Sequence, residues 1–357
     1  MKRFTLSSAA VALVAIMAGA CTADIPSAAT PTDPALAKGG PSAAAYTVLN
    51  IHALLPGAWS EAHGVNDAGD VAGFYYADPS VYAFALVSGV PVTLGGGPGQ
   101  AYGISNGSPA YVAGSSNNLP ARWSLADPTH PALLPLAAGE TFGAAEGVNE
   151  AGDAVGRVGP NAAMWLADGT RVPIATPAGF VRGEGRGIDN AGLAVFQFLT
   201  SLGGSGDRGY VRLASGALIE LPPEGADVST YVNDIAEVTS GLVYVSGSTS
   251  SSSSESSARA VRWTVDAASG AIVASSVLAT TGSHGLGVSQ AGGIAGFSEN
   301  RSLLSDAFLW RGTNVLKLAP PKGLRDARAW AISQSGQHVA GWARIGGGAL
   351  RWTIANP

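Results

Sequence analysis

One recurring position of this chain carries side chains that could bind a ligand. It lies three residues before a repeated Asn, Ser or Asp, and its seven occupants are His63, Tyr102, Glu146, Arg186, Thr230, Leu286 and Trp330. Such a mixture beside near-uniform neighbours is expected where a rigid scaffold presents a binding surface. The alternative is that these residues are solvated loop ends that are free to vary. We predict a ligand site at the mouth of a central channel, formed by His63, Tyr102, Glu146, Arg186, Thr230 and Trp330.

Two catalytic motifs are missing from the sequence, the zinc motif H-E-x-x-H and the phosphate-binding loop. The five histidines do not have the spacing of a local metal site. We therefore expect no metal, no cofactor and no catalytic residues. An enzyme would instead bring two or more of His63, Glu146, Arg186 and Asp189 within hydrogen-bond reach in a pocket.

A motif written seven times sets the architecture that positions these residues. Each copy has a Val or Ile, then Asn, Ser or Asp, a short turn and a strand of small residues, as in GVNDAGDVAG at 64–73. The copies begin near residues 64, 103, 147, 187, 232, 287 and 331. Their period of about 45 residues over 45–357 is the length of a four-stranded propeller blade.

Each repeat predicts four short strands. Glycines such as Gly69 and Gly152 follow the Asn and suit a tight hairpin, because glycine adopts a left-handed backbone without a Cβ clash. Five of the eight tryptophans recur at the end of the third strand, which indicates core packing rather than ligand stacking. The hairpins near Asp67, Asp153 and Gln290 are expected on the face opposite the ligand site. The serine tract at 246–260 is expected to be a mobile loop.

The last repeat stops after its third strand, and an unassigned strand at residues 46–51 precedes the first repeat. Pairing the two ends would cover the edge strands at the seam. The sequence therefore predicts an all-β fold, a seven-bladed β-propeller of four-stranded blades, closed by an N-terminal strand that joins the last blade.

The repeats also resemble a known family. Asp306-Ala307-Phe308-Leu309-Trp310 follows the turn that begins at Ser289, and Tyr82-Ala83-Phe84 is a second match. This pattern resembles the extracellular HAF repeat, whose hallmark is His-Ala-Phe on a strand after an Asn-Asp-x-Gly turn; here Asp306 and Tyr82 replace the His. The resemblance covers 45–357 and implies export and a repeat fold without implying an activity.

The N-terminus has the features of a processing signal. Lys2 and Arg3 precede an apolar run, and Cys21 is the only cysteine. The stretch resembles a bacterial lipobox, with residues 1–20 as signal peptide and Cys21 as the lipidated residue; a plain secretory signal is the alternative. Residues 21–44 are rich in Ala, Pro, Thr and Ser and are expected to form a disordered tether. Thr22 after the cysteine favours, by resemblance, the outer membrane.

Two classes of function follow from the sequence. The first is a non-enzymatic binding module of the cell envelope for a protein or glycan partner, in the periplasm or on the cell surface. The alternative is an envelope hydrolase or lyase built on the same ring. The formal charge of −5 and the lack of a Lys/Arg run argue against nucleic acid. We expect a monomer that touches the membrane only through its lipid anchor.

Overall fold

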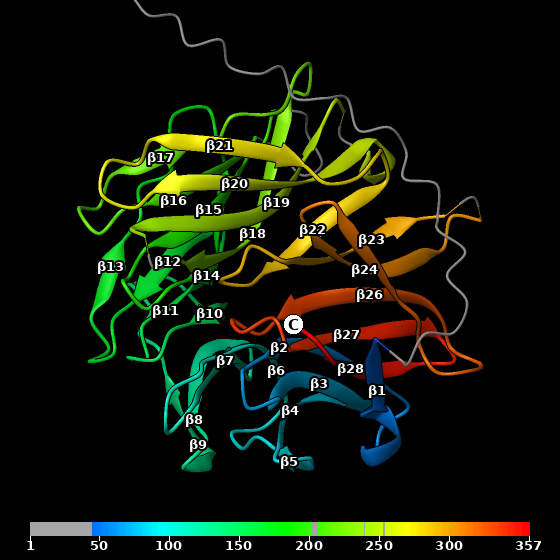
Figure 1. Cartoon of the computed structure of the whole chain (residues 1–357). Helices are drawn as coiled ribbons and strands as arrows, with labels where there is room; N and C mark the ends of the chain where they lie inside the picture. The colour runs from blue at the N-terminus through cyan, green and yellow to red at the C-terminus, as the bar shows by residue number, and fades with distance from the viewer. Residues whose placement is uncertain (1–44, 201–205, 239, 253, 301) are drawn as a thin grey trace, which may run out of the picture. The chain divides into compact units, whose positions relative to one another are not determined.

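The computed structural model describes residues 45–357 except 201–205, 239, 253 and 301. These residues form seven antiparallel sheets of four strands each, arranged around a common centre (Figure 1). Apart from two 3-10 turns, η1 (His52–Leu54) and η2 (Glu255–Ser257), every element in this part of the chain is a strand. The seven-bladed, all-β propeller expected from the repeats is confirmed. The predicted signal peptide (1–20), tether (21–44) and Cys21 lie outside the described residues.

Six sheets take four consecutive strands, and the seventh combines the last three strands with the first. The first three sheets contain β2 (Trp59–Val65), β3 (Val71–Ala77), β4 (Ser80–Val87) and β5 (Val90–Thr93); β6 (Gly99–Ile104), β7 (Tyr111–Ser116), β8 (Leu119–Ser124) and β9 (Asp127–Leu133); and β10 (Gly143–Val148), β11 (Ala154–Val158), β12 (Asn161–Trp165) and β13 (Arg171–Pro173). The next two contain β14 (Arg182–Ile188), β15 (Ala194–Leu199), β16 (Arg208–Arg212) and β17 (Leu218–Glu220); and β18 (Ser229–Glu237), β19 (Leu242–Ser250), β20 (Ala258–Asp266) and β21 (Ile272–Val277). The last two contain β22 (Ser283–Val288), β23 (Ile294–Glu299), β24 (Ser305–Arg311) and β25 (Asn314–Leu318); and β26 (Arg325–Ile332), β27 (His338–Ile345), β28 (Gly348–Ile354) and β1 (Tyr46–Asn50).

The strand β1 completes the seventh sheet. It pairs antiparallel with β28, from Tyr46 opposite Ile354 to Asn50 opposite Leu350, and the blue and red ribbons lie side by side in Figure 1. The next residue, Ile51, is fully buried. The N-terminal strand therefore covers the edge of β28, which would otherwise expose its backbone hydrogen-bonding groups.

Hairpins after the first strand of the sheets have the predicted geometry. The backbone N–H of Gly69 donates to the carbonyl of Asn66 at 3.0 Å, and Gly69 has a φ of 78°. The side chain of Asn66 accepts a hydrogen bond from the N–H of Asp70 at 2.9 Å. The positive φ explains why glycine recurs here, and the side-chain bond explains why Asn precedes it.

The recurring tryptophans are packing residues, as predicted. Trp123, Trp165, Trp263 and Trp352 are at most 1% exposed. Each indole N–H donates to a backbone carbonyl in the segment that leads into its sheet, for example from Trp165 to Pro135 at 2.9 Å and from Trp263 to Pro222 at 3.2 Å. Tryptophan at this position therefore fills the core and also holds the segment that leads into the sheet.

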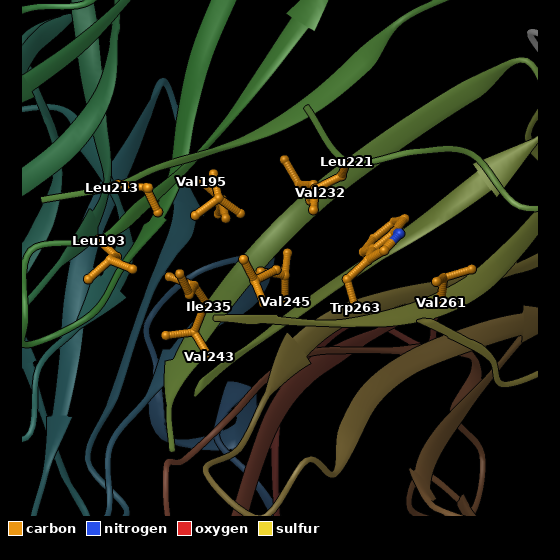
Figure 2. Close-up of a cluster of buried hydrophobic side chains, with 12 residues drawn as sticks. Leu193, Val195, Leu213, Leu221, Val232, Ile235, Val243, Val245, Val261 and Trp263 are labelled. Carbon is orange, nitrogen blue, oxygen red and sulfur yellow. The ribbon is translucent and has the colours of Figure 1, made fainter. Parts of the chain in front are cut away.

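Hydrophobic clusters lie between neighbouring sheets. Twelve buried side chains join the sheet of β14–β17 to the sheet of β18–β21, among them Val195, Val232 and Trp263 (Figure 2). Burying one such side chain stabilises a fold by about 1.5–3 kcal/mol. Because every sheet packs against the next in this way, the ring can hold a fixed set of side chains at its centre.

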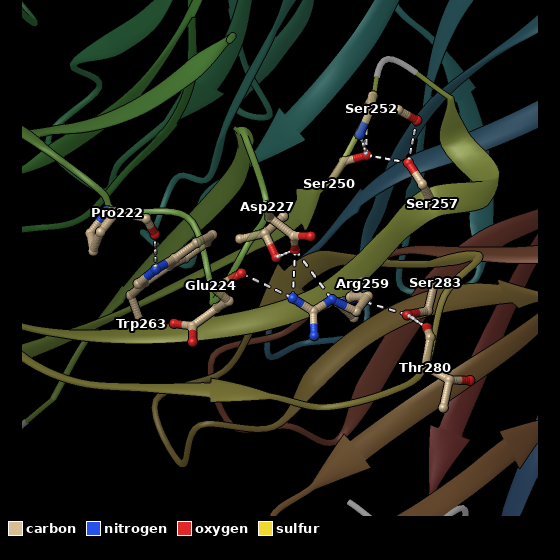
Figure 3. A network of polar contacts seen from close by, with 12 residues as sticks. Pro222, Glu224, Asp227, Ser250, Ser252, Ser257, Arg259, Trp263, Thr280 and Ser283 are labelled. Carbon is tan, nitrogen blue, oxygen red and sulfur yellow. Dashed lines mark hydrogen bonds and ion pairs between the residues drawn. The ribbon is translucent and has the colours of Figure 1, made fainter. Parts of the chain in front are cut away.

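The structure corrects the bounds of the loop expected over the serine tract at 246–260. β19 extends to Ser250 and β20 starts at Ala258, and both of these residues are at most 1% exposed. The tract lengthens one hairpin, and the hydroxyl groups of Ser250 and Ser257 lie 2.5 Å apart at its end (Figure 3). Arg259 on β20 bonds the carboxylate of Asp227 at 2.6 Å in the same network, which ties the long hairpin to the segment before β18.

Candidate functional site

The first strand of every sheet contains one β-bulge, where two residues oppose one on the partner strand. The extra residues are His63, Tyr102, Glu146, Arg186, Asn233, Leu286 and Trp330. All seven line a cavity of about 220 Å³ at the centre of the ring. A bulge redirects a side chain away from the alternation of a regular strand. Here seven bulges direct seven different side chains into one space.

The residue after each bulge allows the first strands to approach closely. It is glycine in five of the seven sheets. A Cβ on Gly64 would lie 2.8 Å from the carbonyl oxygen of Tyr102, and one on Gly103 would lie 2.7 Å from that of Glu146. These distances are too short for a Cβ, so the small residue brings each bulge against the next around the ring.

Five of the six predicted site residues reach the cavity: His63, Tyr102, Glu146, Arg186 and Trp330. Thr230 does not. It is fully buried, and its hydroxyl accepts a hydrogen bond from the backbone N–H of Gly209 at 2.8 Å. Asn233 occupies the bulge instead.

The error in the fifth sheet comes from a misleading sequence similarity. The run Val232-Asn233-Asp234 resembles the Val-Asn-Asp of the first repeat and so predicts that Asn233 corresponds to Asn66. In the structure Ile235, opposite Val245, corresponds to Val65 opposite Val71. The true position of the motif in the fifth sheet is therefore three residues later than predicted. The β-branched Ile235 is the feature of the sequence that indicates this position.

Three aromatic rings form one arc of the site. The imidazole of His63 stacks on the indole of Trp330, with centroids 4.9 Å apart and planes inclined by 26°. It also packs on Phe74 at 5.1 Å and meets the edge of Tyr102 at 5.6 Å. His63, Tyr102 and Trp330 come from the first strands of neighbouring sheets, so the packing of the sheets fixes the arc.

Polar side chains two residues earlier on the same strands orient His63 and Tyr102. His63 Nε2 lies 2.8 Å from a carboxylate oxygen of Glu61. The hydroxyl of Tyr102 donates to the amide oxygen of Gln100 at 2.5 Å. Burial raises the pKa of the Tyr102 phenol to about 12, and the carboxylate of Glu146 adds to the shift. Tyr102 is therefore a neutral donor at physiological pH.

An ion-pair network forms the second arc. The guanidinium of Arg186 bonds Glu146 at 2.7 Å and Glu184 at 2.5 Å. Arg182 also pairs with Glu184, whose side chain is only 5% exposed. Burial disfavours the charged form of Arg186, but the two carboxylates outweigh it and raise the pKa of the guanidinium above its usual value. Arg186 remains a cation held between two anions.

Asp234 follows the bulge of the fifth sheet, where five other sheets have glycine. Its carboxylate accepts the backbone N–H of Val288 at 3.0 Å and that of Ile235 at 2.9 Å. Burial raises the pKa of Asp234 to about 7, although both hydrogen bonds favour the carboxylate. Asp234 lines a second cavity, of about 150 Å³, which shares all seven bulge residues with the first, and no motif in the sequence indicates it.

The hairpins border this second cavity, whereas the bulge residues alone line the cavity of about 220 Å³. Asn106, Glu150, Asn190 and Gln334 line the second cavity together with the bulge residues. Bonds between neighbouring hairpins hold this rim, such as that from Asn190 Nδ2 to Glu150 Oε1 at 2.9 Å. The bulge residues therefore face two cavities, one of which the hairpins border.

The described residues contain neither a cluster of metal ligands nor a membrane-spanning helix. In the part of the chain that the structure describes, no group of three or more His, Cys, Asp or Glu side chains could hold a metal ion. Within residues 45–357 and their stated gaps, no helix is long and apolar enough to span a bilayer.

Comparisons with known proteins identify the fold. No protein-family model matches the chain, and no curated protein matches it. Virginiamycin B lyase from Staphylococcus aureus is similar with a TM-score of 0.54 and 13% identity, covering 87% of this chain and 99% of that one. An oligogalacturonate lyase in complex with manganese is similar with a TM-score of 0.54 and 9% identity, covering 87% of this chain and 93% of that one. The WD40 propeller domain of Doa1 is similar with a TM-score of 0.51 and 13% identity, covering 87% of this chain and 97% of that one. At these identities the likeness shows the propeller fold alone, and propellers include both enzymes and binding domains.

Proposed function

We propose that this protein is a non-enzymatic binding module of the bacterial cell envelope and that a glycan is its ligand in the central cavity. One observation carries the proposal: seven uniform bulges present seven different side chains, with an aromatic arc beside an arc of polar groups. Sugars combine apolar C–H faces with hydroxyl groups, so they suit an aromatic surface bordered by amides, carboxylates and guanidinium groups.

A glycan fits this cavity better than a folded protein partner does. The cavity measures about 220 Å³ and is enclosed by bulge residues from all seven sheets. Stable protein interfaces cover broad surfaces of roughly 800 Å² on each partner. A protein partner would have to bind the outside of the ring, whereas a sugar at the end of a chain can enter it.

The proposed location follows from the N-terminus. A lipid on Cys21 would hold the propeller at a membrane through the segment 21–44, and the HAF-like repeats agree with an exported protein. Stable anchoring needs more than one acyl chain, as in a mature lipoprotein. We propose the outer membrane, with the propeller in the periplasm or at the cell surface.

A glycan array with the soluble domain 45–357 tests the proposed function. We expect a hit that is lost in Trp330→Ala, because this substitution removes an aromatic face of the cavity. Trp59→Ala is the matched control: Trp59 is 37% exposed and stacks on Tyr76, outside the cavity lining. Glycan binding that persists in Trp330→Ala, or a partner that binds only through the outside of the ring, would contradict the proposal.

An envelope hydrolase or lyase is the second candidate. Two observations favour it: Glu61 bonds His63 at 2.8 Å in the manner of a carboxylate that orients a general base, and Glu146 and Arg186 bond each other at 2.7 Å in the cavity. The ion pair, however, satisfies both of its charges. Turnover of an array hit by the wild type, abolished by His63→Ala while binding persists, would establish the enzyme.

A further inference from the structure

We propose that the central cavity selects a sugar with a protonated amine over neutral and acidic sugars. This inference rests on the glycan function proposed above and adds the charge of the ligand. Ionisable groups line the two cavities at the bulge residues. Glu146, Glu150 and Asp234 contribute carboxylates, and Arg186 is the one guanidinium among the lining residues that the structure describes.

The cation of the site is already neutralised. One terminal nitrogen of Arg186 lies 2.7 Å from Glu146, and the other lies 2.5 Å from Glu184. Glu184 is almost fully buried, so releasing Arg186 to an acidic sugar would leave a buried carboxylate with less compensation. An anionic ligand would therefore meet carboxylates and an occupied guanidinium.

Other carboxylates near the cavity are bonded to neutral or weakly basic groups. Both oxygens of Asp234 accept backbone N–H groups, from Val288 and Ile235. Glu61 bonds the imidazole of His63, and Glu150 bonds the amide of Asn190. These bonds leave the negative charges of Glu61 and Glu150 in place, whereas Asp234, whose pKa is about 7, is largely neutral at pH 6. The charged carboxylates attract a cation.

The aromatic arc complements that charge. Trp330, His63 and Tyr102 lie on consecutive first strands and contact one another. The face of an indole or phenol ring attracts an ammonium group within about 6 Å of its centroid. A pyranose that packs its C–H face on this arc would place an amino substituent between the aromatic rings and the carboxylate of Glu146, which is close enough to Tyr102 to raise the pKa of its phenol. A sugar and a cation are thus recognised by the same surface.

Three oligosaccharides of equal length test the proposal by titration calorimetry on the domain 45–357 at pH 6. They are a β-1,4-linked glucosamine trimer, the matching N-acetylglucosamine trimer and a uronic-acid trimer. We expect the glucosamine trimer to bind at least about tenfold more tightly than the N-acetyl form, since acetylation removes the charge, and the uronate not to bind. Added salt should weaken the glucosamine complex.

Variants separate charge selectivity from binding itself. Glu146→Gln should reduce the preference for glucosamine, because it removes a carboxylate while keeping a hydrogen-bonding side chain beside Arg186. Glu140→Gln is the control: it makes the same charge change at a residue paired with Arg171, outside the cavity lining. Trp330→Ala should weaken every trimer that binds.

The outcomes distinguish this inference from the proposed function. Equal affinity for the glucosamine and N-acetyl trimers, both lost in Trp330→Ala, would overturn charge selectivity and leave the glycan function standing. Tighter binding of the uronate would overturn the charge assignment in the same way. If no trimer binds and the glycan array is also empty, the proposed function fails, and this inference fails with it.

Discussion

Asp189 occupies the position that Asn66 has in the first repeat. A buried carboxylate at this position lowers the free energy of unfolding, and the effect can be measured. Asn66 accepts the N–H of Asp70 through Oδ1 and donates through Nδ2 to the carbonyl of Ser105 in the next sheet. Asp189 Oδ1 accepts the N–H of Leu193 at 2.8 Å in the same way. Among the described residues, its Oδ2 is buried and has no hydrogen-bond partner. A carboxylate oxygen thus replaces an amide N–H donor.

The magnitude follows from the pKa of Asp189. Burial raises this pKa from 3.8 to about 6, although the backbone N–H of Leu193 favours the carboxylate. The folded protein therefore holds the proton more tightly than the unfolded chain, and stability is lost as pH rises from about 3.8 through about 6. A gap of about 2.2 pKa units corresponds to a loss of about 3 kcal/mol in the free energy of unfolding at neutral pH.

Asp189→Asn should remove this loss. Denaturant unfolding of the domain 45–357 at pH 4 and pH 7 measures it. The variant should be about 2–4 kcal/mol more stable at pH 7, a range that includes one added hydrogen bond, and the gain should shrink by about 2 kcal/mol at pH 4. The reverse exchange, Asn66→Asp, should destabilise the fold at pH 7 more than at pH 4. An equal gain at both pH values, or no gain at pH 7, would refute the reasoning.

Three further substitutions or deletions test the seam, the corrected register and the anchor. Deletion of residues 40–52 removes β1 and the buried Ile51; because loss of a buried Ile side chain alone costs about 2–5 kcal/mol, the melting temperature should fall by at least about 5 °C in calorimetry. Thr230→Val leaves the N–H of Gly209 without its acceptor, so unfolding should become easier by about 1–3 kcal/mol while glycan affinity stays unchanged; a loss of affinity with normal stability would restore Thr230 to the site. Cys21→Ser should move the protein from the membrane fraction to the soluble fraction, and wild-type protein without an acyl mass at its N-terminus would rule out the anchor.

The blade count and most of the ring could be predicted because they depend on local rules repeated seven times. Glycine after an Asn marks the hairpin, as at Gly69 and Gly152, and each hairpin fixes the end of a first strand. His63 and Trp330 each stand three residues before the Asn or Ser of their turns, so this spacing predicts both residues even though it does not reveal the bulge. The bulge itself was not visible, since it depends on the close approach of neighbouring first strands at residues such as Gly64.

The fifth sheet shows where counting fails. Its first hairpin keeps the glycine with a positive φ, Gly241, but Val238 stands where the first repeat has Asn66. Val232-Asn233-Asp234 therefore resembles the motif more closely than the true turn does. The long pairing of β18 with β19, from Ser229 opposite Ser250 to Glu237 opposite Val243, fixes the true register. Such pairing is set by contacts across strands and by burial, and a short motif does not encode it.

The ion pairs of the ring could not be predicted either, and they change how the site should be tested. Arg186 is the extra residue of its bulge, so alternation along β14 does not predict its bond to Glu184, and only the closing of the ring brings Glu146 to the same guanidinium. Arg186→Ala would leave Glu184 buried with fewer compensating charges, and a loss of binding would then include a loss of stability. Trp330 contributes a ring face rather than a buried charge. Of the paired substitutions Arg186→Ala and Trp330→Ala, the second therefore isolates the contribution of the cavity surface.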